Sequence, residues 1–336
     1  MTLCFDAESL EGHVSNHDGL NAMRECFASE AAGKTRLPHR IDTPSGHGFL
    51  RVMPAVFDDV MGLKIMTLVE GVGNRYMVLL YQCDTGALLA LFDADELTRI
   101  RTAATTALAG TQMCATPPER IGLIGTGFEA IGHLRMLAHI WPLRTVHAYS
   151  PNAERRERFA AQMSAELGID VKAVATSREA LAGMPCVVLA TKAKLAVIDG
   201  ADFAPGTVVL SIGSTRLDLR ELDDRTLARA AVVVVDDAGA VLAESADIAE
   251  SVKSGNLTHE HLLPLAALVD GKMLPAISGP RDLLVFKSVG TALQDLAMAR
   301  AVYRDATMRA RGHDIGNVLT LKGFANKAVL VTQTTP

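Results

Sequence analysis

The sequence is poor in cysteine, has no excess of basic residues and contains no long apolar run. Its cysteines are scattered without a Cys-x-x-Cys pair, which favours the reduced thiols of a cytosol over a disulfide framework: Cys4, Cys26, Cys83, Cys114 and Cys186. The 33 lysines and arginines against 38 acidic residues give a net charge of −5, which argues against nucleic acid or an anionic membrane as a partner. The apolar runs near 77–81 and 229–235 are much shorter than the roughly 20 residues of a membrane helix.

The N-terminal stretch agrees with a cytosolic location. Residues 1–8 include Asp6 and Glu8, where a signal peptide would have a basic segment and an apolar core. We therefore expect a cytoplasmic protein. The chain has 336 residues, 49% of them hydrophobic and 21% charged, which is an ordinary globular composition at a length that suggests two domains.

The first third of the chain predicts one helix and then a group of strands. Helical spacing covers residues 17–32, and a long Ala-rich helix is expected over 94–114, ahead of Pro117 and Pro118. Between these helices lie extended segments at 48–53, 61–69, 75–83 and 87–92. Neighbouring strands without intervening helices are typical of an antiparallel sheet, with a hairpin turn at Asp84-Thr85-Gly86.

From residue 120 onward, short strands alternate with helices. The expected strands are 121–124, 145–149, 171–174, 186–190, 207–211 and 231–235, and the expected helices are 128–140, 152–166 and 177–183. This alternation implies a parallel sheet with right-handed crossovers. The apolar run 283–286 leads into a helix expected over 290–311, which cannot add another alternating unit and is expected to return to the first domain.

A glycine-rich turn stands in the context that dinucleotide binding requires. The strand around Ile121 to Ile124 leads into the turn Gly125-Thr126-Gly127-Phe128-Glu129-Ala130, and a helix follows. Gly125 can make the tight turn, Gly127 lets the backbone approach a pyrophosphate, and Ala130 allows close packing of helix on strand. The alternative is a strand-to-helix turn of an α/β domain that binds no nucleotide. We expect all six residues to contact a cofactor at the helix N-terminus.

The end of the second strand indicates which dinucleotide would bind. An NAD-preferring site carries an acid there for the ribose 2′-hydroxyl, but this sequence has none until Glu154. Ser150, Asn152 and Arg155 are instead suited to a 2′-phosphate, so we favour NADP over NAD. If Arg155 and Arg156 are only surface charges, the preference stays open.

Three more stretches accompany the turn: Gly62-Leu-Lys64-Ile-Met-Thr, Arg101-Thr-Ala-Ala-Thr-Thr-Ala, and Val285-Phe-Lys-Ser288-Val-Gly290-Thr-Ala-Leu-Gln-Asp295. Together with the turn they resemble the ornithine cyclodeaminase/mu-crystallin family, and the likeness runs from about residue 10 to 310. The resemblance implies an α/β fold with a Rossmann-type domain (116–290) and a discontinuous α+β substrate-binding and dimerisation domain (1–115 and 291–336). It also implies a homodimer formed through the sheet, an active site between the domains, and small α-amino or α-imino acids as substrates.

Substrates of this kind need a cation for the carboxylate and a proton-handling group near the nitrogen. The resemblance places carboxylate-binding arginines at Arg40 and Arg101, whose planar guanidinium groups suit a carboxylate. The alternative for Arg40 is an arginine on a loop surface, and the alternative for Arg101 is a structural ion pair or a phosphate contact. Lys64 lies within an apolar strand, where a desolvated lysine has a lowered pKa, and the family has a catalytic lysine here. An outward-facing lysine is the alternative.

Thr215 falls where cyclodeaminases carry a catalytic aspartate. A threonine cannot help to remove protons from an ammonium group, whereas reduction of an existing C=N bond needs only hydride, a proton and carboxylate binding. Thr191 and Ser288 are further candidates for cofactor contact, with a helix N-cap as the alternative for Ser288. Asp236 and Asp237 end an apolar strand, where a structural role is favoured over one in the site.

The residues therefore favour an NAD(P)H-dependent reductase of small 2-imino acids such as Δ1-pyrroline-2-carboxylate. Alternatives are an ornithine cyclodeaminase-like ammonia lyase with bound NAD, a cis-3-hydroxyproline dehydratase, and a non-catalytic NADPH-binding protein of the mu-crystallin type. We expect no metal, because His259 and His261 form a tight pair without a third ligand nearby.

Overall fold

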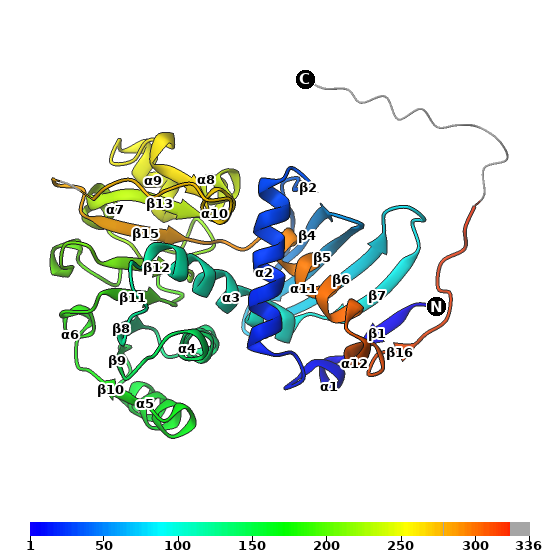
Figure 1. Ribbon diagram of the computed structural model, residues 1–336, viewed down its shortest axis with the longest axis horizontal. Coiled ribbons are helices and arrows are strands. Elements are labelled where there is room, and N and C mark those ends of the chain that lie inside the picture. Colours follow the sequence, from blue (N-terminus) through cyan, green and yellow to red (C-terminus); the bar gives the residue numbers. More distant parts are fainter. Residues whose placement is uncertain (278, 323–336) are drawn as a thin grey trace.

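Two sheets form the body of the molecule, and the computed structural model describes residues 1–277 and 279–322. The sheets come from different parts of the chain, and helix α3 (Asp95–Met113) runs between them (Figure 1). α3 packs on helices of both parts, so it links the two sheets mechanically. The predicted α/β fold with a Rossmann-type domain is confirmed.

The second sheet is parallel throughout, as the alternation of strands and helices predicts. Its strands lie in the order β10 (Asp170–Ala173), β9 (Thr145–Tyr149), β8 (Arg120–Ile124), β11 (Cys186–Leu189), β12 (Val208–Ser211), β15 (Leu283–Lys287), β13 (Ala230–Val235) and β14 (Leu262–Pro264). The chain leaves β8 first toward β9 and later returns to form β11 on its other side. Ligands of open α/β sheets bind at the carboxyl ends of the strands beside such a reversal.

The helices of this domain alternate with its strands. They are α4 (Phe128–Ile140), α5 (Ala153–Leu167), α6 (Ser177–Leu181), α7 (Asp224–Arg229), α8 (Ala238–Glu244), α9 (Ala246–Lys253) and α10 (Leu265–Val269), with 3₁₀ turns at Gly200–Asp202 and His259–His261. Six of the strands and α4, α5 and α6 match the predicted segments to within a few residues.

The first sheet is mainly antiparallel. Its strands lie in the order β16 (His313–Asp314), β1 (Leu3–Phe5), β7 (Leu88–Asp93), β6 (Gly73–Gln82), β5 (Val60–Val69), β4 (Gly48–Phe57) and β2 (Thr35–Arg36), and β3 (Ile41–Ser45) also pairs with β4. Helices α2 (Asn16–Ala31) and α11 (Ala292–Arg304) lie against one another beside this sheet (Figure 1), and α1 (Ala7–Leu10) and α12 (Ala306–Arg309) are single turns.

The register of β4, β5 and β6 decides which side chains face inward. Met53, Lys64 and Val78 lie opposite one another, so they share the face that α11 covers. Gly62 permits this contact, because a Cβ atom there would lie 2.9 Å from the Leu296 side chain of α11. The absence of a side chain at Gly62 therefore lets α11 approach the strand that carries Lys64.

The single helix expected over 290–311 is wrong. α11 ends at Arg304, and Asp305 caps the separate turn α12 by accepting a hydrogen bond from the Met308 amide. The segment does pack on α2, β4 and β5 of the first sheet. The domain boundaries stay a prediction, and residues 323–336 of the expected discontinuous domain lie outside the described residues. In the described chain no helix combines the length and apolar character of a membrane span.

Candidate active site

A cavity of about 370 Å³ lies between the two sheets. On one side it is lined by residues of β4, β5, β6 and α3, and on the other by the first turn of α4 and the segments after β11, β12 and β15. Seven cationic side chains but a single carboxylate line it, namely Arg40, Arg51, Lys64, Arg101, Lys192, Lys194 and Arg216, and Glu129. This balance of charge suits an anionic ligand.

The sequence-predicted residues divide into two groups. Those that line the cavity are Arg40, Lys64, Arg101, Glu129, Thr215 and Ser288. The rest of the predicted cofactor set lies around the carboxyl ends of β8, β9 and β11, namely Gly125, Thr126, Gly127, Phe128, Ala130, Ser150, Asn152, Arg155 and Thr191. The two groups meet at Glu129, which belongs to the turn and also lines the cavity.

Lys64 is buried, with 3% of its surface exposed. Its Nζ donates to Thr98 Oγ1 at 2.7 Å and to Asp295 Oδ1 at 3.0 Å, and it lies 4.6 Å from the centre of the Tyr76 ring. Burial lowers the pKa of Lys64 to about 8, against the opposing attraction of Asp295. The ammonium group is therefore poised to exchange a proton near neutral pH.

Arg101 lies one helical turn beyond Thr98 on α3 and is also buried. Its Nε donates to Asp295 Oδ1 at 3.0 Å and its Nη1 to Gln294 Oε1 at 2.9 Å. Gly290, with φ of +79°, packs against the guanidinium, and a Cβ atom there would lie 2.7 Å from Nη1. The motif around Gly290 is thus shaped to hold Arg101 against the cavity wall.

Arg40 lies in the segment between β2 and β3 and reaches the other domain. It forms an ion pair with Glu244 at the end of α8, and its Nη2 donates to the Thr215 carbonyl oxygen at 3.4 Å. Burial lowers the pKa of the Arg40 guanidinium to about 9, so it stays charged at neutral pH. Arg40 and Thr215 therefore come together at one end of the cavity, as a shared ligand would require.

The turn after β8 has the features that a pyrophosphate needs. Gly125 adopts φ of +109°, and a Cβ atom there would collide with the Ala190 carbonyl oxygen. Gly127 is the N-cap of α4, and no side chain caps this helix, so its first amide groups are available to an anion. A Cβ atom at Gly127 would meet nothing within 4 Å, so the backbone is open to a ligand. Phe128 is 54% exposed beside it, and Ala130 is fully buried.

At the end of β9, polar groups surround Ser150. Its hydroxyl accepts from Thr126 Oγ1 at 2.9 Å, which joins this strand end to the glycine-rich turn. Asn152 caps α5 by accepting from the Arg155 amide, while the Arg155 side chain is exposed. Arg156, rather than Arg155, reaches back to donate to the Ser150 carbonyl oxygen at 3.1 Å.

The chain is similar to known proteins over most of its length. The chain matches the model of the ornithine cyclodeaminase/mu-crystallin family over residues 2–309. The chain belongs to this family. It is 31% identical over 294 residues to the ketimine reductase mu-crystallin of Rattus norvegicus, covering 84% of this chain and 90% of the rat protein. The resemblance predicted from the sequence is confirmed.

Two solved structures of similar proteins align with nearly the whole of this chain. The Δ1-pyrroline-2-carboxylate reductase of Thermococcus litoralis, in complex with NADH and L-proline, aligns with a TM-score of 0.86 at 29% identity, covering 94% of this chain and 100% of that one. An archaeal alanine dehydrogenase dimer with bound NAD aligns with a TM-score of 0.86 at 26% identity, covering 94% and 99% of the two chains.

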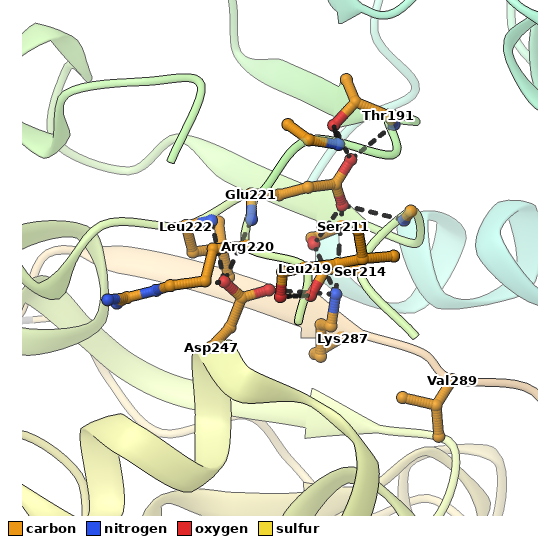
Figure 2. Close-up of polar contacts among 12 residues, drawn as sticks. Thr191, Ser211, Ser214, Leu219, Arg220, Glu221, Leu222, Asp247, Lys287 and Val289 are labelled. Atoms are coloured by element: carbon orange, nitrogen blue, oxygen red, sulfur yellow. Dashed lines mark hydrogen bonds and ion pairs between the residues drawn. The ribbon is translucent and has the colours of Figure 1, made fainter. Parts of the chain in front are cut away.

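Beneath the cavity, this family member buries a charged network (Figure 2). Lys287, Glu221 and Asp247 are all completely buried. Lys287 Nζ lies 3.2 Å from Asp247 Oδ2 and 3.9 Å from Glu221 Oε2, and it donates to Ser211 Oγ at 3.0 Å. The glutamate also accepts from the amide and the hydroxyl of Thr191, at 2.6 and 2.9 Å, so Thr191 is tied to the network.

Glu221 holds two loops of the cavity wall together. Besides Thr191, it accepts from the Gly213 amide at 2.8 Å, and so it fixes the segments that carry Lys192 and Thr215. The Asp247 carboxylate accepts from the amides of Glu221 and Leu222, both at 3.1 Å. The network therefore sets the shape of the edge on which the cofactor residues lie.

Replacing Glu221 with alanine is expected to lower the free energy of unfolding by about 3–5 kcal/mol, because it leaves Lys287 and several donors buried without this partner. Urea titration followed by circular dichroism measures the loss. The exposed Glu119, paired with Arg144, provides the control, since Glu119→Ala is expected to cost less than about 1 kcal/mol. Equal losses in both variants would show that the buried network contributes nothing particular to stability.

The remaining predicted residues have structural partners. Asp236 accepts from Ser288 Oγ at 2.6 Å and from the Gly290 amide at 2.7 Å, and Asp237 caps α8. The helix N-cap considered for Ser288 is wrong, because the N-cap of α11 is Thr291. His261 Nδ1 lies 2.9 Å from Thr258 Oγ1, and within residues 1–277 and 279–322 no group of three or more side chains is arranged to hold a metal.

Sequence reasoning missed Asp295 and the buried network. A signal was present for Lys287, which ends an apolar strand much as Lys64 lies within one. Asp295 lies in a helix that also holds Gln294 and Arg300, so its type is not unusual for its surroundings. Tyr76, which stacks its ring beneath Lys64, and Arg51, which pairs with Asp42, carried no comparable signal.

Proposed function

We propose that this protein is an NAD(P)H-dependent reductase of small 2-imino acids, such as Δ1-pyrroline-2-carboxylate. The observation that carries the proposal is the meeting of Lys64, Arg101 and Arg40 in one cavity beside the glycine-rich turn. The names of the relatives, a ketimine reductase and a Δ1-pyrroline-2-carboxylate reductase, support it.

The cavity residues match the parts of the substrate. Arg101 would bind the carboxylate with the donors that Asp295 and Gln294 leave free, and Arg40, which reaches from the same domain toward Thr215, would bind it from the other end of the cavity. Lys64 would give its proton to the imine nitrogen. The nicotinamide, when bound, supplies the hydride to the adjacent carbon. The residues fit such a cofactor, because the uncapped amides of α4 and the open backbone at Gly127 suit a pyrophosphate.

Thr215 favours reduction over cyclodeamination. It lines the cavity and offers a hydroxyl group, which cannot act as the base that deamination of a saturated amine needs. Ornithine cyclodeaminase-like chemistry is the second candidate, because Glu129 lines the same cavity and provides a carboxylate. Dehydration of a hydroxyproline and binding of NADPH without catalysis are the other candidate functions.

A spectrophotometric screen of cyclic imino acids and of amino acids with each cofactor tests the proposal. We expect oxidation of NADPH, and more slowly of NADH, with at least one cyclic ketimine acid. Release of ammonia from ornithine without net change at 340 nm would favour cyclodeamination instead. Tight NADPH binding without turnover on the whole panel would favour a non-catalytic protein.

We propose NADP as the preferred dinucleotide, and Ser150→Asp tests the preference. An aspartate at the end of β9 would accept from a ribose 2′-hydroxyl but repel a 2′-phosphate. The ratio of kcat/KM for NADPH to that for NADH is expected to fall by about 100-fold, which corresponds to about 2.7 kcal/mol. Ser150→Ala is the control and should change the ratio by less than about fivefold. An unchanged ratio in the aspartate variant would place the 2′-phosphate elsewhere.

We further propose a homodimer formed through the outer face of the first sheet. β4, β5 and β6 present an apolar surface on the side away from α11, made of Leu50, Val52, Pro54, Val56, Met61, Leu63, Ile65, Met77, Leu79 and Tyr81. Pro54, Leu63 and Leu79 lie opposite one another at its centre. The assembly of the alanine dehydrogenase relative as a dimer supports the proposal.

Leu63→Asp is expected to convert the dimer to a monomer, because it would bury an unpaired carboxylate at the centre of the interface. Size-exclusion chromatography with light scattering gives the mass directly. Met273→Asp, at a position that is 84% exposed away from this sheet, is the control and should leave the mass unchanged. A dimer that survives Leu63→Asp would contradict this interface.

A further inference from the structure

Asp295 binds two cations of the cavity through a single oxygen. Its Oδ1 accepts from Lys64 Nζ and from Arg101 Nε, each at 3.0 Å, and its Oδ2 has no hydrogen-bond partner among the described residues. The carboxylate is completely buried beneath the cavity. A buried carboxylate shared by two cations orders both of them before any ligand arrives.

Two glycines bring Asp295 into this position. Gly62 lets α11 approach β5 closely, since a Cβ atom there would collide with both the Leu79 carbonyl oxygen and Leu296. Gly290 leaves room for the Arg101 guanidinium just before α11 begins. The two glycines therefore leave the space in which Asp295 packs against Lys64 and Arg101.

The hydrogen bonds leave a defined set of donors for a substrate. Lys64 has three N–H donors and uses two of them, on Asp295 and on Thr98. Arg101 uses its Nε donor on Asp295 and one Nη1 donor on Gln294, so the second Nη1 donor and both Nη2 donors are left. Both side chains line the cavity, where the remaining donors are available to a carboxylate and to a nitrogen lone pair.

The charges around Lys64 have opposite effects on its pKa. The guanidinium of Arg101 disfavours its ammonium form, whereas the carboxylates of Asp295 and, more weakly, Glu129 favour it. The face of the Tyr76 ring and the Thr98 hydroxyl complete the surroundings. Burial with these neighbours gives Lys64 a pKa of about 8, and the loss of the Asp295 charge would lower that value further.

We propose that Asp295 is a positioning residue, which aims the ammonium of Lys64 and the guanidinium of Arg101 at an imino-acid substrate and keeps Lys64 protonated for transfer to the nitrogen. The catalytic part of this proposal rests on the proposed function. The positioning itself can be measured without any substrate.

The titration of Lys64 in protein labelled with [ε-¹³C]lysine gives this measurement, with the signal assigned by its absence in Lys64→Arg. In the wild-type protein we expect a midpoint near pH 8. Asp295→Asn, which keeps the shape but removes the charge, should move the midpoint down by at least about one pH unit. Asp295→Glu restores the charge and should recover most of the shift. Asp295→Ser also removes the charge and should lower the Lys64 midpoint in the same way, so it replaces Asp295→Asn as the test if the asparagine variant does not fold.

Asp247→Asn is the matched control, because Asp247 is an equally buried carboxylate in helix α9, on the side of the second sheet. It should destabilise the protein without moving the Lys64 midpoint. A midpoint that stays within about 0.3 pH units in both Asp295→Asn and Asp295→Ser would overturn the proposal.

The pH profile of imine reduction separates this proposal from the proposed function. The acid form of Lys64 is the proton donor, so activity falls as the pH rises through its pKa, and the alkaline limb should move down with the midpoint in Asp295→Asn. A moved midpoint in a protein without reductase activity would support the positioning and contradict the proposed function. An active reductase in which Asp295→Asn moves neither the Lys64 midpoint nor the alkaline limb would support the proposed function and contradict the positioning by Asp295.

Discussion

Replacing Lys64 with methionine is expected to lower kcat for imine reduction by about 10³-fold, the usual contribution of a positioned proton donor. The side chain keeps its length and apolar stem but loses the ammonium group that Asp295 and Thr98 hold toward the cavity. Steady-state kinetics with Δ1-pyrroline-2-carboxylate measure the loss. The alkaline limb near pH 8 should also disappear from what activity remains, because it reports the deprotonation of this residue.

The cofactor affinity of Lys64→Met should stay within about twofold of wild type by NADPH fluorescence titration, since Lys64 lies on β5 of the first sheet. Lys172→Met removes a half-exposed lysine of β10 and is expected to leave both kcat and affinity unchanged. If Lys64→Met retains the wild-type kcat, proton transfer must be assigned to another group.

Gly125→Ala is expected to weaken NADPH binding by at least about 100-fold and to lower the free energy of unfolding by about 3 kcal/mol. Two effects combine at this position. The φ of +109° is unfavourable for a residue with a Cβ atom, and that atom would collide with the Ala190 carbonyl oxygen at the end of β11. The turn that presents the α4 amides must therefore open.

The control for Gly125→Ala is Gly206→Ala, which has φ of +82° but no atom within 4 Å of the added Cβ. It should cost about 1 kcal/mol and leave NADPH binding unchanged. Fluorescence titration and urea unfolding measure the two quantities. Wild-type affinity in folded Gly125→Ala would contradict the assignment of this turn to the cofactor.

The sequence was most informative where a pattern repeats. The parallel sheet and its helices α4 and α5 follow from alternation over long segments, and the antiparallel strands β4, β5 and β6 follow from neighbouring extended runs. Short elements such as β2 and α12 were missed, because two to four residues carry no periodicity.

Within the candidate site, the residues found from the sequence are those with an unusual type for their surroundings. Lys64 stands out in an apolar strand, and Arg101 stands out in an Ala-rich helix. Partners such as Asp295 were not found, because their role depends on contacts between segments about 200 residues apart, as the separation of Arg101 and Asp295 by 194 residues illustrates. Such pairings arise from tertiary packing and leave no local pattern.

The two faces of strand β5 serve different purposes, and the register of the strand fixes both of them at once. Lys64 points into the cavity, whereas its neighbours Leu63 and Ile65 point to the proposed partner subunit. A one-residue slip against β4 would exchange these faces, exposing the lysine to the interface and pushing leucine into the cavity. An insertion or deletion that shifts the register of β5 would therefore disrupt both the proposed dimer interface and the position of Lys64 in the cavity. Homologues should tolerate changes of side chain here far more readily than changes of length.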